Sequence, residues 1–147
     1  MTLRQKIIFI LVLLFTISAF IDKQGWFSWD SGRIEIDTAD SIGYAFENRL
    51  SNIQINGSGR VKAILKDDLK GSRHQKFIVS VGSGHTVLIA HNIDLAPRID
   101  SIQKGDRVDF SGEYEWNEKG GVVHWTHHDP DNKHTGGWLK HNGRTYR

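Results

Sequence analysis

The feature that most constrains this chain is a strict alternation of side chains between residues 108 and 116. The even positions carry Val108, Phe110, Tyr114 and Trp116, with a glycine at 112, and the odd positions carry only acidic residues and a serine. A period of two is typical of a β-strand that turns one face to a core and the other to water. The segment therefore predicts an antiparallel β protein.

Four further segments carry strand signals, and turns or irregular stretches separate them. They are residues 53–65, 77–81, 87–91 and 122–128. The first is long and contains Gly57 and Gly59, where a barrel strand would bend. Five strands, with an insertion between the third and the fourth, predict a mainly β fold, a small five-stranded Greek-key barrel of the OB type. A two-layer sandwich is the alternative.

The segments that flank these strands complete the predicted organisation. Steps of three and four between apolar residues predict a short amphipathic helix that packs on the barrel and is capped by Asp37 or Thr38. The predicted parts are a signal peptide or membrane anchor at 1–22, a juxtamembrane linker at 23–37, the helix at 38–52, the barrel at 53–130 and a polar tail at 131–147.

The N-terminal segment predicts where the protein resides. Arg4 and Lys6 precede an apolar run over residues 7–21, the pattern of a signal peptide or an anchor. As a helix this run spans roughly 22 Å, less than a bilayer core of about 30 Å, which favours cleavage. No Ala-x-Ala site follows it, which favours an uncleaved anchor. In both cases we expect the domain on the periplasmic side of the inner membrane, tethered or released.

Composition excludes several classes of site. The chain has no cysteine, which removes disulfides, thiolate metal sites and thiol nucleophiles. It has 19 Lys+Arg against 17 Asp+Glu, too small an excess to indicate nucleic-acid binding. No Ser-His-Asp order and no phosphate-binding glycine loop is present.

Several stretches resemble the bacterial family known as domain of unknown function 3465. They are residues 66–77, 86–97, 112–117, 124–130 and 136–138. The resemblance covers roughly residues 42–146. It implies a small exported or membrane-tethered protein with an OB-like domain and no established activity, so no family site residues can be transferred.

The last predicted hairpin sets the expected positions of several histidines. A four-residue loop at 117–120 gives inner pairs and outer pairs between the two strands. The inner pairs are Tyr114–Val123, Gly112–Trp125 and Phe110–His127, and the outer pairs are Glu113–His124, Ser111–Thr126 and Asp109–His128. A carboxylate opposite His124 or His128 would raise the imidazole pKa from about 6.5 toward neutral, which predicts a pH-responsive face.

The same register limits metal binding. On one strand His124 and His128 would lie about 13 Å apart, too far to share an ion. A zinc site would instead need His127 or His128, joined by Asp129 and by His134 or His141 folding back from the tail. The predicted metal residues are therefore His127, His128, Asp129 and His134, with His141 as a further candidate. A protein without any cofactor, whose histidines form ordinary pairs, is the other hypothesis.

A second group of candidate residues surrounds the loop after the first strand. OB folds bind ligands beside this loop, and basic groups there suit phosphates or carboxylates. The predicted ligand-binding residues are Lys70, Arg73, His74 and Lys76 in the loop and His91, Asn92 and Asp94 at the end of the third strand. Asp67 and Asp68 cancel part of the charge, and Phe77 offers no outward stacking platform, so nucleic acid is not favoured.

These patterns predict a non-catalytic periplasmic binding module that recognises a protein partner or a small anionic ligand. Two alternatives stay open. One is a metal-assisted hydrolase that uses His91, His127, His128 and Asp129 with a tail histidine. The other is a pH-responsive structural or regulatory subunit of the envelope.

Overall fold

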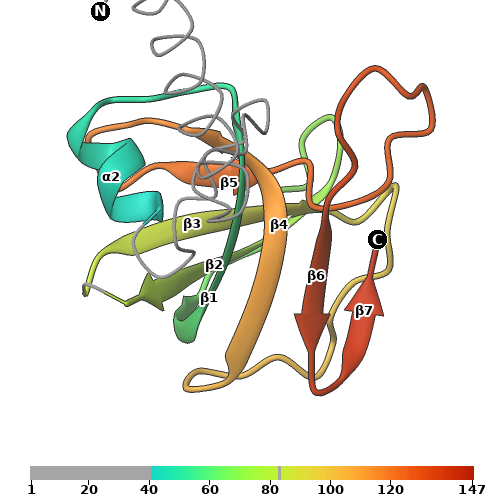
Figure 1. Cartoon of the computed structure of the whole chain (residues 1–147). Coiled ribbons are helices and arrows are strands. Elements are labelled where there is room, and N and C mark those ends of the chain that lie inside the picture. The colour runs from blue at the N-terminus through green and yellow to red at the C-terminus, as the bar shows by residue number, and fades with distance from the viewer. Residues whose placement is uncertain (1–40, 83) are drawn as a thin grey trace, which may run out of the picture. The chain divides into compact units, whose positions relative to one another are not determined.

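A computed structural model describes residues 41–147 except residue 83. The predicted anchor or signal peptide, the linker and the helix cap lie outside these residues. The described part contains the helix α2 (Ser41–Glu47) and the strands β1 (Ile53–Ile64), β2 (His74–Val81), β3 (Thr86–Asn92), β4 (Arg107–Glu115), β5 (Val122–His124), β6 (Trp138–His141) and β7 (Arg144–Tyr146) (Figure 1). Within it, no helix has the length and apolar character needed to cross a membrane.

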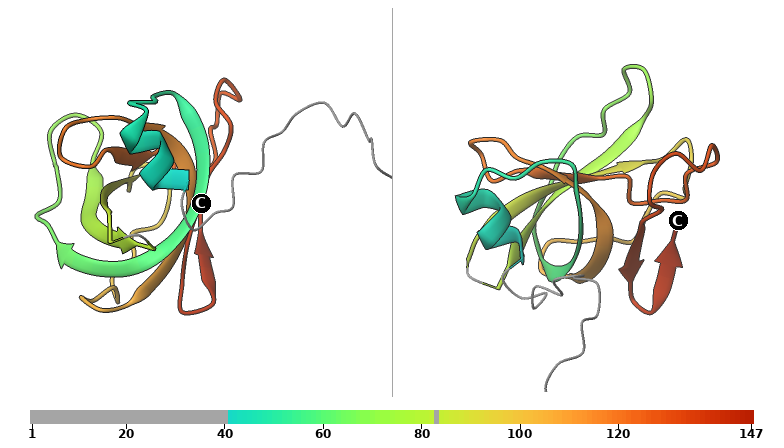
Figure 2. Two further views of the ribbon diagram at one scale, coloured as in Figure 1. Left: turned by 60° about the vertical axis from the view of Figure 1, so that its left-hand side comes forward. Right: turned by 45° about the horizontal axis from the view of Figure 1, so that its top comes forward.

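Five strands close into a barrel. Their order is β1-β2-β3-β5-β4, and β1 pairs again with β4 to complete the ring. Strands β3 and β5 run parallel, and the other neighbours in the ring run antiparallel. The left view of Figure 2 shows the strands arranged around a common centre. The predicted mainly β, five-stranded barrel is therefore confirmed, in place of the sandwich.

Strand β1 joins both sides of the barrel and must curve to do so. Residues 53–60 pair with β4, and residues 59–64 pair with β2. A side chain at Gly57 would meet the ring of Phe110, and one at Gly59 would meet the carbonyl oxygen of Ser80. The two glycines predicted at the bend are thus required because other groups approach the backbone closely.

The alternating segment forms β4 and fills the barrel interior as predicted. Phe110 and Tyr114 are fully buried. Trp116 is partly buried, and its Nε1 donates a hydrogen bond to the carbonyl oxygen of Phe46 at 3.0 Å.

The helix α2 ends at Glu47, so the predicted helical end near residue 52 is wrong. Its end is closed by the Leu50 amide, which donates to the Ala45 carbonyl at 2.9 Å.

Strand β5 is much shorter than the predicted strand over 122–128. The predicted pairs Tyr114–Val123 and Glu113–His124 are confirmed. Strand β5 ends at His124, and Trp125 has a left-handed backbone with φ of 50°. The other four predicted pairs are therefore wrong, namely Gly112–Trp125, Phe110–His127, Ser111–Thr126 and Asp109–His128.

The segment predicted to be a polar tail belongs to the sheet. Strand β6 pairs with the part of β4 that β5 leaves free, with Leu139 opposite Phe110 and Trp138 opposite Ser111. Strand β7 pairs with β6 through a turn at Asn142 and Gly143, whose φ values are 47° and 78° (Figure 1). Leu139 is fully buried. The barrel therefore carries a hairpin where the sequence predicted an appendage.

Candidate metal centre

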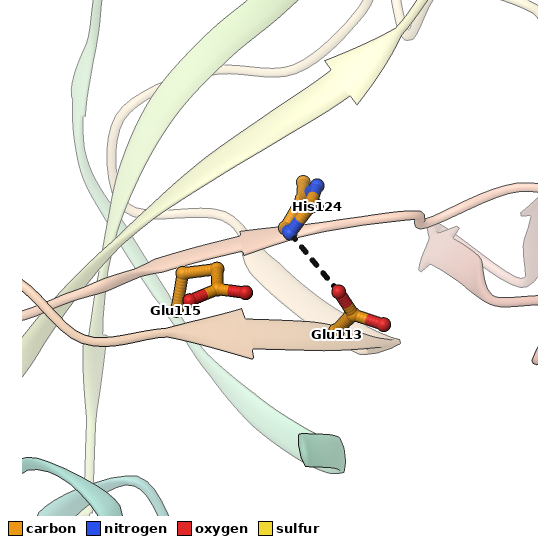
Figure 3. A group of neighbouring side chains, drawn as sticks. All are labelled: Glu113, Glu115 and His124. Carbon is orange, nitrogen blue, oxygen red and sulfur yellow. Dashed lines mark ion pairs between the residues drawn. The ribbon is translucent and has the colours of Figure 1, made fainter. Parts of the chain in front are cut away.

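Three ligand-type side chains meet on the outer face of β4 and β5. Glu113 and Glu115 are two positions apart on β4, so they point to the same side of the sheet. His124 on β5 lies directly opposite Glu113. One ligand atom from each residue falls within 4.8 Å of the others (Figure 3). Antiparallel pairing of two short segments thus brings two carboxylates and one imidazole together.

The surroundings of His124 favour the neutral form of its imidazole. Burial lowers the pKa of His124, and this effect outweighs the opposite effect of the Glu113 and Glu115 carboxylates. The predicted rise of its pKa toward neutral is therefore wrong. Its Nε2 is shielded from solvent, lies 3.6 Å from Oε1 of Glu113, and makes no hydrogen bond to any described residue. A neutral imidazole is the form that binds metal ions.

A second imidazole lies next to this group. Nδ1 of His134 is 3.7 Å from Oε2 of Glu113, and its ring stacks on Trp125 with centroids 3.9 Å apart and planes at 15°. The loop that carries His134 folds around the buried carboxylate of Asp129. Asp129 Oδ2 accepts hydrogen bonds from the amides of Lys133 at 2.6 Å and His134 at 2.8 Å.

The predicted metal residues do not form one cluster. Asp129 is occupied by backbone amides, including the Asp131 amide on Oδ1 at 3.0 Å, and these amides hold the pKa of Asp129 below its usual range. Nδ1 of His127 donates a hydrogen bond to the His128 carbonyl oxygen at 2.8 Å, and the side chain of His128 is exposed. Of the four, only His134 lies beside the group on β4 and β5. Asp129 is used to organise the loop, and a shared ion for these four residues stays a prediction.

His91 is a structural residue inside the barrel. Its Nε2 donates to the Pro97 carbonyl oxygen at 3.2 Å, so its Nδ1 accepts from the Thr126 hydroxyl at 2.8 Å. Burial lowers the pKa of His91 to about 4. Gln75, also fully buried, bonds both backbone groups of Ile99 at 2.9 Å. These two side chains fasten the long connection between β3 and β4 to the barrel.

The predicted anion-binding residues lie close together, but their charges are partly compensated. Nε of Arg73 is 2.6 Å from Oδ1 of Asp94, and Nζ of Lys76 is 3.8 Å from Oδ2 of Asp68. Nδ1 of His74 donates to the Ser72 carbonyl oxygen at 2.8 Å. The Arg73 amide and guanidinium hold the pKa of Asp94 below its usual range.

Two further predicted anion-binding residues, Asn92 and Lys70, form no ion pair with a described residue. Asn92 Oδ1 accepts the amide of Asp94 at 2.9 Å, which forms a local turn. The backbone amide of Lys70 donates to Oδ1 of Asp68 at 3.1 Å. Lys70 is exposed and forms no ion pair with a described residue. One uncompensated lysine is a weak basis for an anion site.

The sequence contained a signal for the group of Glu113, Glu115 and His124, although the sequence analysis did not predict a metal site there. The pairing of Glu113 with His124 was predicted, but only as a pH-sensitive pair. Glu115, two positions further along the same polar face, adds the second carboxylate. Two acidic residues at i and i+2 with a histidine opposite the first are the pattern that could have identified it.

The chain is similar to a known protein family. A family model described as "Protein of unknown function (DUF3465)" matches residues 27–147. No curated protein matches the chain. The match includes the barrel, the residues Glu113, Glu115 and His124, and the β6–β7 hairpin. The chain belongs to the family of proteins of unknown function DUF3465.

Proposed function

We propose that this chain is a non-catalytic binding module on the periplasmic side of the bacterial inner membrane and that it binds a divalent transition-metal ion. Glu113, Glu115 and His124 are its ligands, and zinc is the first candidate ion. Residues 7–21 would anchor the module or direct its export. The barrel is proposed to be of the OB type, which its strand order, its β1–β4 closure and its parallel β3–β5 pair support.

The observation that carries this proposal is the mutual approach of the three ligand atoms within 4.8 Å. Ligand atoms about 2.0 Å from a tetrahedral ion are roughly 3.3 Å from one another, so small side-chain rotations suffice to close the group. An ion would also neutralise the two neighbouring carboxylates. Imidazole nitrogen and carboxylate oxygen are both common zinc ligands.

The other predicted functions receive less support from the contacts. An anionic ligand would have to displace Asp94 from Arg73 and Asp68 from Lys76. A hydrolase based on His91 and Asp129 would need groups that already hold the backbone or a buried hydroxyl. The group on β4 and β5 requires no such rearrangement.

Calorimetric titration of the full chain in detergent with zinc chloride tests the proposal. We expect one zinc ion per chain. His124→Ala should weaken binding by about 100-fold or more, because loss of a ligand exceeds the 10- to 100-fold effect of a residue that only supports one. His128→Ala is the matched control, since this imidazole is exposed and outside the group, and it should bind as the unchanged chain does.

Two results would end the proposal. One is a full chain that binds no zinc above the level of a buffer blank. The other is a His124→Ala chain that is folded by circular dichroism and binds zinc as tightly as the His128→Ala control.

A further inference from the structure

We infer that His134 supplies a fourth ligand to the proposed centre, so that protein groups enclose the bound ion. This inference rests on the proposed function and defines its coordination. It makes the centre a closed binding site, because zinc sites with four protein ligands leave no position for a substrate, whereas catalytic zinc sites keep one open.

Glu113 lies between the two imidazoles. Its Oε1 is 3.6 Å from Nε2 of His124, and its Oε2 is 3.7 Å from Nδ1 of His134. The two separations involve different oxygens of one carboxylate, so a tetrahedral ion would bind one of these oxygens and the imidazole beside the other oxygen would rotate to reach the ion. His134 is not within 4.8 Å of all three ligand atoms, so its ring must move toward Glu115 and His124 when the ion binds.

The side chain of His134 has the freedom for this movement, and its backbone is fixed. About 40% of the side chain is exposed, and its ring contacts Trp125 by stacking. The backbone amide is held by Oδ2 of Asp129 at 2.8 Å. Rotation about the side-chain bonds therefore shifts the imidazole without disturbing the loop.

Asp129 is a positioning residue in this arrangement. Its two oxygens accept three amides from the loop, those of Asp131, Lys133 and His134. The left-handed backbone of Trp125 ends β5 and places the indole against His134. The sequence between His124 and His134 is thus folded into a short loop that returns the second imidazole to the first.

Cobalt(II) bound to the full chain tests whether the centre is closed. Cobalt absorbs visible light, and its spectrum changes when azide occupies an open coordination position. We expect the spectrum of the unchanged chain to be insensitive to azide. In His134→Ala, water should take the fourth position, the affinity for cobalt should fall by about 100-fold or more, as for loss of any ligand, and azide should alter the spectrum.

Asp129→Asn should change affinity and azide response in the same direction as His134→Ala, because it weakens the contacts that hold the loop. Adding Asp129→Asn to His134→Ala should cause no further loss, since both changes act through one imidazole. His134→Gln provides a folded alternative if the alanine variant is unstable, and His128→Ala is the control that should match the unchanged chain.

The outcomes separate this inference from the proposed function. If the unchanged chain binds no cobalt, or if His124→Ala binds it equally well, the proposed function fails. If His124→Ala loses cobalt but His134→Ala and His134→Gln keep both affinity and spectrum, only the fourth ligand is disproved. An azide response in the unchanged chain equal to that of His134→Ala disproves the closed centre.

Discussion

At the scale of single residues, burial assigns the histidines of this chain to different tasks. His91 is fully buried and has two hydrogen-bond partners, whereas the exposed His128 has none among the described side chains. The side chain of His124 is partly exposed, and its Nε2, beside two carboxylates, is shielded from solvent. Sequence alone could not separate these cases, because alternation shows which face a residue occupies but not how deeply its ring atoms are covered.

His91 makes stability depend on pH. Its pKa is about 4 in the folded chain and about 6.5 when unfolded, so below pH 6.5 the unfolded chain binds a proton that the folded chain does not. The free energy of unfolding should therefore fall as the pH drops from 6.5 toward 4. His91 should account for about 2 kcal/mol between pH 7 and pH 5.

Urea unfolding at pH 7 and pH 5 measures this effect. In His91→Gln, which does not titrate, the loss between the two pH values should be smaller by that amount. An equal loss in both chains would show that His91 is not the group responsible. Carboxylates with lowered pKa values, such as Asp106 and Asp129, keep their contributions above their unfolded pKa near 3.8 and lose them only as the pH falls from there through their lower folded pKa.

At the scale of elements, the period of two in the sequence predicted the strands that remain regular. It failed where the backbone leaves the extended conformation. The period of two located β4 to within one residue and gave its first two pairs with β5. It failed beyond His124, because the left-handed conformation of Trp125 depends on tertiary contacts. The final hairpin did carry a signal, since Asn142-Gly143 is a strong turn pair, but the polar composition around it suggested a tail.

In the candidate site too, contacts set by strand register could be predicted from the sequence, whereas contacts set by loop backbone could not. The pairing of Glu113 with His124 followed from hairpin register, and Glu115 could have been added from its position on the same face. His134 was predicted as a ligand together with His127, His128 and Asp129, and the structure places its ring beside Glu113. Its approach depends on backbone amides that bind Asp129, and no side-chain pattern reports such contacts.

Strand β6 should be as important to stability as the barrel strands. Leu139 is fully buried opposite Phe110, so Leu139→Ala should lower the free energy of unfolding by about 2–5 kcal/mol. Lys140→Ala, on the exposed side of the same strand, should change it by less than about 0.5 kcal/mol. Urea denaturation compares them, and equal effects of the two changes would mean that β6 is a dispensable appendage.

At the scale of the whole molecule, the described residues form a closed barrel that turns an unusual group of side chains outward. The interior is filled by apolar residues from all five barrel strands and from β6. Buried polar groups such as Gln75 and His91 have partners inside the barrel. The export or anchoring of this barrel by residues 7–21 stays a prediction. The outer face of β4 and β5 is where the geometry supports a function.

Anomalous diffraction at the zinc absorption edge, from crystals of the full chain grown with zinc chloride, examines that face most directly. We predict one strong peak about 2.0–2.2 Å from ligand atoms of Glu113, Glu115 and His124, with His134 turned toward it. A map with no peak between these side chains, or with its only protein-bound peak at His127 and His128, would contradict this prediction.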